Sequence, residues 1–325
     1  MNTNLWFWIA FNFGVLCVLA IDLFSFQRRA HAPSTKEAAI WTAVWVALSL
    51  GLNALIWYWE GHAKALEFLT GYLVEYSLSV DNIFVFVLVF SYFAVPAAYQ
   101  HRVLFWGIFS ALILRGVMIG LGVAFVEAFH WALHLFGVFL LFTGIKMFFG
   151  RKKVVDIARN PLIRLVRRLL PVSDSYHGPR FTVLCEGRRV LTPLTLVLIM
   201  IEITDVLFAL DSIPATFGIT RDPFIVYTSN ICAILGLRSL YFLLAGVVHK
   251  FVYLKPALAI ILSFIGAKML LADVYHIPTA ASLGVVGLVL LAAIGLSLLV
   301  NRQHPVTKEP VTETDPHSSP VTNLR

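Results

Sequence analysis

EYSLSVDNIFVF, residues 75–86, and EITDVLFALDSIPA, residues 202–215, are the two stretches that decide the fold of this chain. Each places carboxylates in a largely apolar run, and each run extends far enough on both sides to cross a bilayer, which takes about 20 apolar residues. A carboxylate near the centre of such a span costs about 2.5–3.5 kcal/mol on insertion scales. We therefore expect a membrane protein whose buried acids have a function or a partner.

The composition of the chain indicates that lipid is the solvent for much of it. Of 325 residues, 59% are hydrophobic and 13% are charged, against about 25% charged residues in soluble domains. The three cysteines form no CxxC pair, which indicates neither a disulfide framework nor a zinc site. The sequence also has no haem motif and no nucleotide-binding loop. We expect neither an enzyme nor a permanently bound cofactor.

Nine apolar stretches have the length of a membrane span. They predict an all-α polytopic protein with a single transmembrane domain over residues 1–300. Residues 301–325 are rich in Pro, Thr, Ser and charge, which predicts a disordered cytoplasmic tail. The nine stretches are Leu5 to Phe24, Ile40 to Trp59, Leu66 to Ala94, Val103 to Val126, Trp131 to Phe149, Leu191 to Phe217, Phe224 to Val248, Ala257 to Ala272 and Ala280 to Val300.

The distribution of basic residues predicts the orientation of the spans. With the N-terminus outside, the inside segments carry 20 of the 25 Lys and Arg residues, and the outside loops carry Lys64 and Arg221. This asymmetry follows the positive-inside rule, and it accounts for the net charge of +7 without nucleic acid as a partner. The long loop at 150–190 is then basic and cytoplasmic. Its stretch PLIRLVRRLL, residues 161–170, is typical of a helix on the inner leaflet or of an ordinary solvated connector.

Three features recur in the same order along the chain and indicate an internal repeat. Each copy holds three helices, spans 3–5 and spans 6–8, and an odd number gives the two copies opposite orientations. Inverted repeats with a site between them near the midplane are a signature of secondary transporters, although duplication also produces them in other proteins. The matching features are Glu75 with Asp81 against Asp205 with Asp211, Arg115 against Arg238, and Gly144-Ile-Lys146-Met against Gly266-Ala-Lys268-Met.

The acids inside the predicted spans outnumber the arginines there. Arg115 and Arg238 lie mid-span, and each can neutralise one acid, which makes them candidates for pairing helices or gating a route. The remaining acids require a cation, a proton or water. The six acids are Asp22, Glu75, Asp81, Glu202, Asp205 and Asp211.

The chemistry of these side chains favours a divalent cation as the partner. Carboxylates, an amide oxygen and hydroxyls are hard ligands that suit Mg²⁺, Ca²⁺ or Mn²⁺. We hypothesise that Asp81 and Asp211, one from each copy, hold the ion near the midplane, with Glu75, Asp205 and Glu202 as second ligands or proton carriers. The predicted metal-binding set is Asp81, Asp211, Asn82, Ser212, Glu75, Asp205 and Glu202.

Two local features bear on this site. Pro214 cannot donate to the carbonyl of Leu210 and clashes with it, so we expect a kink or break that frees a carbonyl beside Asp211. At the outer end of the fifth span, His130 and His134 share a face with Glu127, as 127–134 is two helical turns. Those three residues indicate either interfacial anchors or an external metal site.

The two stretches quoted first, together with TSNICAILGLR at residues 228–238, resemble signature segments of the TerC family. The resemblance covers nearly the whole chain. It implies a multi-pass protein of the bacterial inner membrane, related to the LysE-type transporters. It further implies divalent metal homeostasis, chiefly manganese export, with Asp81 and Asp211 as the central acidic positions.

Two hypotheses for the function follow from these observations. The first is export of Mn²⁺ in which metal and protons compete for the same buried oxygens, so that proton entry drives metal exit. The second is a non-transporting membrane-bound redox modulator, an older label within the family, or a scaffold that acts through partner proteins on the basic loop. An intramembrane aspartyl protease also needs two membrane aspartates, but its glycine-flanked aspartate motif is missing from the sequence.

Overall fold

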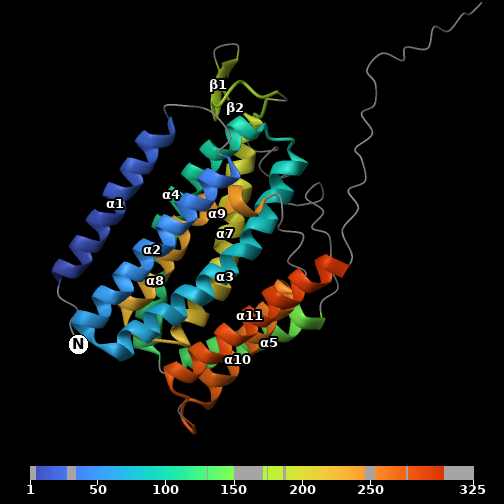
Figure 1. Cartoon of the computed structure of the whole chain (residues 1–325). Helices are drawn as coiled ribbons and strands as arrows, with labels where there is room; N and C mark the ends of the chain where they lie inside the picture. Colours follow the sequence, from blue (N-terminus) through green and yellow to red (C-terminus); the bar gives the residue numbers. More distant parts are fainter. Residues whose placement is uncertain are drawn as a thin grey trace, which may run out of the picture.

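The computed structural model describes a bundle of long helices with one short hairpin (Figure 1). The described residues are 5–27, 34–129, 131–149, 171–173, 175–185, 188–245, 253–275 and 277–303. Of the predicted tail, residues 301–303 belong to the last helix, and the rest of it lies outside the described residues, as does the stretch 161–170. The elements are α1 (Leu5–Gln27), α2 (Thr35–Glu60), α3 (His62–Tyr92), α4 (Ala97–Ala128), α5 (Ala132–Phe149), β1 (Thr182–Cys185), β2 (Arg188–Leu191), α7 (Pro193–Phe217), α8 (Pro223–Leu235), α9 (Leu237–Leu244), α10 (Leu254–Leu271) and α11 (Thr279–Gln303).

The prediction of an all-α polytopic membrane protein is confirmed. Each of the nine apolar stretches coincides with a helix, or with the bent pair α8 and α9. Seven of the described helices are long and apolar enough to cross a membrane, and the bent pair makes eight. The apolar part of α1, Leu5–Ala20, is shorter than a full span, so the count of nine stays a prediction.

Local sequence fixes where several helices begin. The Ser34 side chain accepts a hydrogen bond from the Glu37 amide at 3.2 Å and caps α2. Gly61 separates α2 from α3 with a φ of +89°, a backbone conformation that favours glycine. Pro193 occupies the first turn of α7, where its missing N–H breaks no helical hydrogen bond. These signals place the turns between helices at the ends of the apolar runs.

α7 does not break at Pro214, the alternative of a kink there stays a prediction, and a bend occurs elsewhere. α7 runs through Pro214 and ends at Phe217. Pro214 has no N–H to donate to the Leu210 carbonyl, and it lies three residues before the end of the helix. The predicted seventh span instead divides at Gly236, where α8 and α9 meet at 41°. Arg238 therefore lies in the first turn of α9, directly after the bend.

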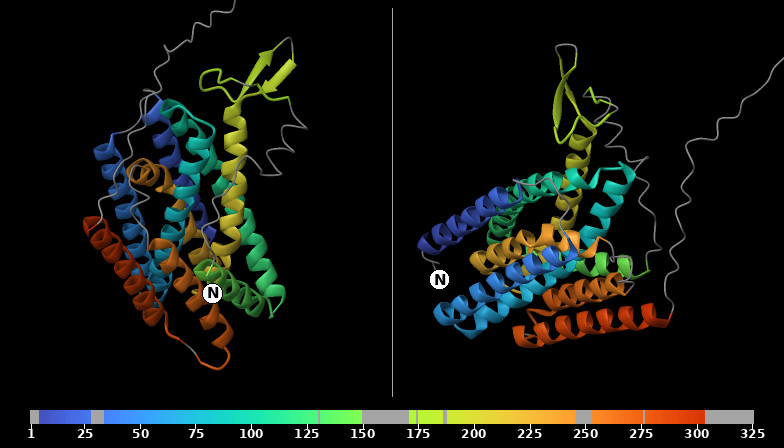
Figure 2. Two further views of the ribbon diagram at one scale, coloured as in Figure 1. Left: turned by 90° about the vertical axis from the view of Figure 1, so that its right-hand side faces the viewer. Right: turned by 45° about the horizontal axis from the view of Figure 1, so that its top comes forward.

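α3 runs through the middle of the bundle and packs against α2, α7, α8 and α11 (Figures 1 and 2). It is antiparallel to α7, since Glu67 in its second turn accepts a hydrogen bond from Thr220, just beyond the end of α7. α5 is likewise antiparallel to α10, since His134 near its start pairs with Asp273 just after the end of α10. These directions are what the predicted inverted repeat requires, and the repeat itself stays a prediction.

α5 and α10 approach each other closely through the glycines of the repeated motif. A Cβ on Gly144 would lie 2.7 Å from the carbonyl oxygen of Ala259 on α10. A Cβ on Gly266 would lie 2.6 Å from the backbone nitrogen of Leu141 on α5. Small residues allow helix backbones in a membrane to pack at such distances. The duplicated glycine therefore serves the same contact from both sides.

A β-hairpin projects beyond the bundle at the start of α7 (Figure 2). β1 and β2 pair antiparallel, with Thr182 opposite Leu191, so Leu191 belongs to the hairpin and not to the predicted sixth span. The Tyr176 hydroxyl donates to the carbonyl of Phe93, 2.6 Å away, and connects this segment to the end of α3. Burial raises the pKa of Tyr176, which keeps its hydroxyl a donor.

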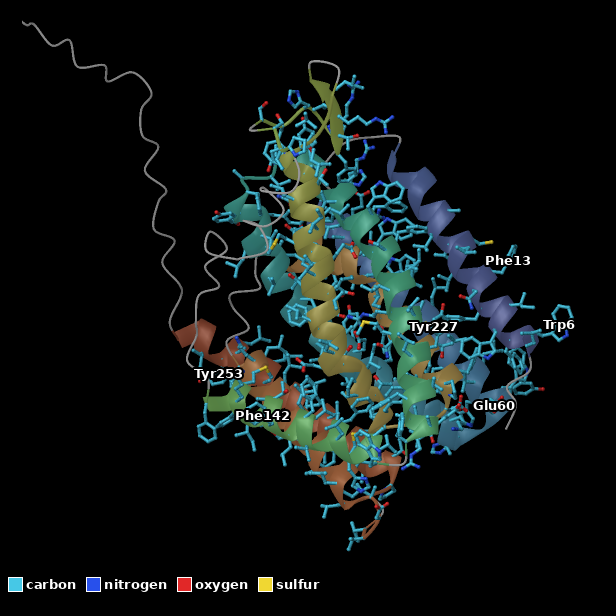
Figure 3. The ribbon with its side chains drawn as sticks, turned by 180° about the vertical axis from the view of Figure 1, so that it is seen from behind. Trp6, Phe13, Glu60, Phe142, Tyr227 and Tyr253 are labelled. Atoms are coloured by element: carbon cyan, nitrogen blue, oxygen red, sulfur yellow. The ribbon has the colours of Figure 1, made fainter. Side chains whose placement is uncertain are left out.

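The outer surface of the bundle is apolar, as lipid contact requires. Trp6 and Phe13 on α1 are 72% and 68% exposed and point away from the other helices (Figure 3). Hydroxyls inside the helices mostly bond to the carbonyl four residues earlier, as Ser77 does with Leu73. Such bonds satisfy polar groups where no water is at hand.

Candidate functional site: a buried arginine and its carboxylates

Arg115 on α4 is the largest of the fully buried side chains, at 1% exposure. Its Nη1 donates to Glu75 Oε1 on α3. Its Nη2 lies 3.1 Å from Asp205 Oδ1 on α7, and its Nε lies 3.4 Å from Asp205 Oδ2. The guanidinium therefore joins three helices by charge-assisted hydrogen bonds, which are the strong ones in a medium that excludes water.

The two carboxylates that Arg115 holds are equivalent positions of the predicted repeat. Glu75 is the first acid of the duplicated pattern on α3, and Asp205 is the first acid on α7. Both are buried, at 1% and 3% exposure. Sequence analysis placed Glu75 and Asp205 among second metal ligands or proton carriers. Their contacts with Arg115 show that each already has a cationic partner.

Neutral polar residues complete the surroundings of Arg115. Nη1 also lies 3.3 Å from Ser212 Oγ and 3.3 Å from Asn230 Oδ1. Asn230 Nδ2 in turn donates to Thr216 Oγ1 at 3.2 Å and to the Val226 carbonyl at 3.0 Å. All four helices α3, α4, α7 and α8 thus contribute to one hydrogen-bonded network.

Asn230 and Thr216 were missed by sequence reasoning as members of the site. The only signal was their polarity within apolar helices, since both are fully buried at 0% exposure. Uncharged side chains of this kind usually bond within their own helix, and nothing in their spacing shows that they reach another one. Only the packing of α8 against α3 and α4 brings Asn230 to Arg115.

Asp211, the second acid of the α7 copy, is not among the partners of Arg115. Asp211 is half-buried on α7 and has no ion-pair partner among the described side chains. Asp81 lies on α3 directly before Asn82, and its own side chain falls outside the described part of the structure. Asn82 is 1% exposed, and its Oδ1 has no hydrogen-bond partner within the described residues.

Glu202 faces a different neighbour. Its carboxylate accepts a hydrogen bond from Ser110 on α4, and Gly107 on the same helix leaves room for it, with Glu202 Oε1 3.7 Å from where a Cβ would stand. Glu202 is nine residues from Asp211, which on a helix of 3.6 residues per turn places the two on opposite faces. The structure therefore does not bring Glu202 and Asp211 together.

The described side chains contain no group of three or more His, Cys, Asp or Glu residues arranged to hold a metal ion. The predicted pair of Asp81 and Asp211 involves a side chain outside that set, so its role in metal binding stays a prediction. Arg238 is buried at 5% exposure beside the bend between α8 and α9. Its proposed part in pairing helices or gating stays a prediction as well.

A cavity of about 1460 Å³ opens at the end of the bundle opposite the hairpin. Its polar wall centres on Lys64, whose Nζ lies 2.8 Å from Glu67 Oε2 and 3.3 Å from Asp222 Oδ2. Thr220 donates to the same Glu67 oxygen. The loop after α7 is thereby tied to the start of α3, and Lys268 lines the same cavity.

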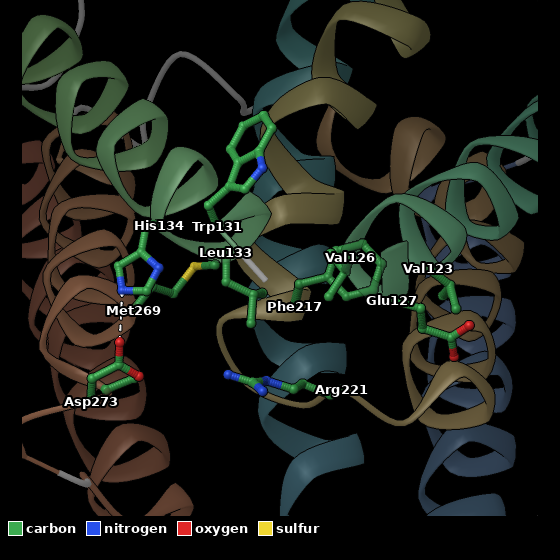
Figure 4. A pocket seen from close by; sticks show the side chains of 11 residues that line it. Val123, Val126, Glu127, Trp131, Leu133, His134, Phe217, Arg221, Met269 and Asp273 are labelled. Atoms are coloured by element: carbon green, nitrogen blue, oxygen red, sulfur yellow. Dashed lines mark ion pairs between the residues drawn. The ribbon is translucent and has the colours of Figure 1, made fainter. Parts of the chain in front are cut away.

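The alternative of an external metal site falls in a second, neighbouring pocket of about 580 Å³ (Figure 4). His134 Nε2 lies 3.0 Å from Asp273 Oδ2, and both side chains are exposed. Glu127 lines the same pocket but lies away from that pair in Figure 4, and His130 falls outside the described residues. The described residues thus bring together one histidine and one carboxylate, too few to hold a metal ion.

These features define the class: a polytopic α-helical membrane protein with an arginine–carboxylate network buried between its helices. The sequence pattern described as "Integral membrane protein TerC family" matches residues 60–305, and the chain belongs to that family.

Related proteins align over most of this chain. An uncharacterized membrane protein of Myxococcus xanthus is 50% identical over 300 residues, which is 92% of this chain and 94% of that protein. The "Putative membrane-bound redox modulator Alx" of Escherichia coli (strain K12) is 51% identical over 306 residues, or 91% and 95% of the two chains. The "Thylakoid membrane protein TERC, chloroplastic" of Arabidopsis thaliana is 45% identical over 84% of this chain and 70% of that protein. No solved structure matches the chain.

Proposed function

We propose that this chain exports a divalent cation, Mn²⁺ in the first instance, across the bacterial inner membrane. In this proposal the N-terminus lies outside and the C-terminus in the cytoplasm, as the distribution of Lys and Arg predicts. The observation that carries the proposal is that Arg115 pairs with some of the buried acids and not with others. Arg115 binds the first acid of each duplicated pattern. Asp211, the second acid on α7, has no ion-pair partner among the described side chains, and by the repeat we assign the cargo to Asp211 and to Asp81, its counterpart on α3.

The chemistry of the cargo follows from these two carboxylates. Two negative charges on opposed helices match the charge of one divalent cation, and carboxylate oxygens are ligands that Mn²⁺ prefers. Asn82 and Ser212 are neighbours of the two aspartates and offer further oxygens, although Ser212 Oγ also contacts Arg115 at 3.3 Å. Glu75 and Asp205 serve the helix-joining network in this proposal.

Export against a membrane potential requires an energy source. Moving two positive charges outward against 100 mV costs roughly 4.6 kcal/mol, at about 2.3 kcal/mol per charge. A second cation whose binding alters the affinity for the metal couples the two movements. The buried carboxylates predict protons in this role.

Efflux of Mn²⁺ from loaded cells tests the site assignment. Asp81→Asn and Asp211→Asn should each abolish efflux, because each removes half of the negative charge that balances the ion. Glu202→Gln is the matched control, an acid on the same helix as Asp211 but on its opposite face. Unchanged efflux in both aspartate variants would contradict the assignment of Asp81 and Asp211 as ligands of the transported ion.

The alternative is a membrane-bound redox modulator, the role in the name of the Escherichia coli relative, or a scaffold that acts through partner proteins. It predicts that shortening the basic loop within 150–190 alters the cellular phenotype more than neutralising Asp81 does. Equal phenotypes for the Asp81→Asn and Asp211→Asn variants and the wild type, with loss on shortening the loop, would favour it.

A further inference from the structure

Three buried oxygens without hydrogen-bond partners lie on α3. Glu75 Oε2, Ser79 Oγ and Asn82 Oδ1 each have no donor or acceptor within the described residues. The three side chains are 1%, 0% and 1% exposed. A buried polar group without a partner costs about 1–3 kcal/mol, and a charged one costs more. Such atoms in an ordered core therefore point to a bound species.

The three oxygens share one face of the helix. Ser79 and Asn82 follow Glu75 by four and seven residues, which is one and two turns of an α-helix. The hydroxyl of Ser77, by contrast, bonds to the Leu73 carbonyl of its own helix at 2.6 Å. Ser77 therefore has a hydrogen-bond partner in its own helix, whereas the Ser79 hydroxyl has none among the described residues.

The charge of the Arg115 network identifies the bound species as a cation of charge +1. One guanidinium faces two carboxylates, which leaves a surplus of one negative charge in a site closed to water. Both oxygens of Asp205 lie near Arg115 nitrogens, whereas Glu75 offers only Oε1 to it. The surplus charge therefore rests beside Glu75 Oε2.

The kinds of atom favour a metal cation over a proton. A carboxylate, a hydroxyl and an amide oxygen are all hard ligands, and a hard cation with its water is attracted to all three. A proton on Glu75 would bind that side chain alone and would leave the Ser79 and Asn82 oxygens without a partner. A divalent ion would overcompensate the single surplus charge.

We propose that Glu75 Oε2 and Ser79 Oγ bind one exchangeable sodium ion, with Asn82 Oδ1 reached through water one turn further along α3. Asn82 adjoins Asp81, so the row leads from the Arg115 network to the proposed cargo site. This step rests on the proposed function, and it makes Na⁺ the coupling ion in place of the proton.

Thermal unfolding of the purified full-length protein in detergent tests sodium binding without any assumption about transport. The chloride salts of sodium, potassium and choline are compared at equal ionic strength and constant pH. We expect Na⁺ alone to raise the melting temperature, saturably, because it binds the folded state. Equal curves in the three salts would overturn the proposal, as would a response to pH with none to Na⁺.

Three variants locate the site. Glu75→Gln should remove the sodium effect while the protein still folds, since Arg115 and Asp205 then balance each other. Ser79→Ala should weaken the apparent sodium affinity by roughly tenfold, the equivalent of about 1.4 kcal/mol for one lost contact. Ser77→Ala, the matched control, should leave the affinity unchanged. An unaltered sodium response in Ser79→Ala would overturn the assignment.

Transport by the reconstituted wild-type protein separates this inference from the proposed function. Mn²⁺ movement driven by a Na⁺ gradient, and absent in Glu75→Gln, supports both. Mn²⁺ movement that needs no Na⁺ overturns the sodium inference and leaves the proposed function standing. Sodium-dependent stability without Mn²⁺ movement supports the site and removes the proposed function.

Discussion

Replacing Arg115 with glutamine should destabilise the folded protein more than any surface substitution. The change removes the charge that Glu75 and Asp205 share and leaves both carboxylates buried without a cation. Removing one partner of a buried ion pair costs about 3–5 kcal/mol. In large soluble proteins, each kcal/mol lost from the free energy of unfolding lowers the melting temperature by about 2 °C. The melting temperature of Arg115→Gln should therefore fall by about 6–10 °C.

The assay is thermal unfolding of the purified protein in detergent, followed by loss of the monodisperse peak. Arg102→Gln is the matched control on the same helix, because its guanidinium lies over the Phe181 ring at 5.5 Å, an interaction of only about 0.5–1 kcal/mol at an exposed site. Adding Glu75→Gln to Arg115→Gln should recover part of the loss, since one buried charge is removed.

A melting temperature of Arg115→Gln within 2 °C of the wild type, at the scale of about 2 °C per kcal/mol, would refute this reasoning. It would mean that Glu75 and Asp205 are neutral in the folded state, or that water reaches them. In either case Arg115 would not hold α3, α4 and α7 together.

Three further predictions concern packing, the cavity and the hairpin. Gly266→Ala should cost about 1–3 kcal/mol by forcing α5 and α10 apart, whereas Gly120→Ala, where a Cβ meets nothing within 4 Å, should change the melting temperature little. Lys64→Gln should cost under about 1 kcal/mol, because the pair is partly exposed, and should remove the salt dependence of stability; equal salt dependence in both proteins would contradict this. Tyr176→Phe should expose the hairpin segment to limited proteolysis without altering transport. The wild type should stay protected from cleavage up to about pH 10, because burial raises the pKa of Tyr176 above its usual value of about 10. Identical cleavage of Tyr176→Phe and wild type would show that the hydroxyl is not the anchor.

Much of the architecture could be predicted because each helix that crosses a bilayer needs a long run of apolar residues, which is visible in the sequence. The apolar stretches coincide with helices, and the family assignment from the two acidic segments is confirmed. The hairpin was missed, although two β-prone runs, at 182–185 and 188–191, are separated by two residues that end in glycine. Pro214 does not end its helix, which continues to Phe217.

The partners in the buried network could not be read from spacing. Arg115 lies 40 residues from Glu75 and 90 from Asp205, and only the packing of three helices decides which acids it meets. Charge counting did predict that the arginines could not neutralise every acid. It could not predict that one arginine would hold the first acid of both copies, or that Asn230 would join them.

The central claim is that Asp81 and Asp211 carry a divalent cation through the membrane. The most direct measurement is Mn²⁺ movement into proteoliposomes that contain the purified protein and an internal Mn²⁺-sensitive dye. The wild type and Glu202→Gln should give a signal, and Asp81→Asn and Asp211→Asn should give none. A wild-type signal no faster than that of protein-free liposomes, or full rates in both aspartate variants, would contradict it.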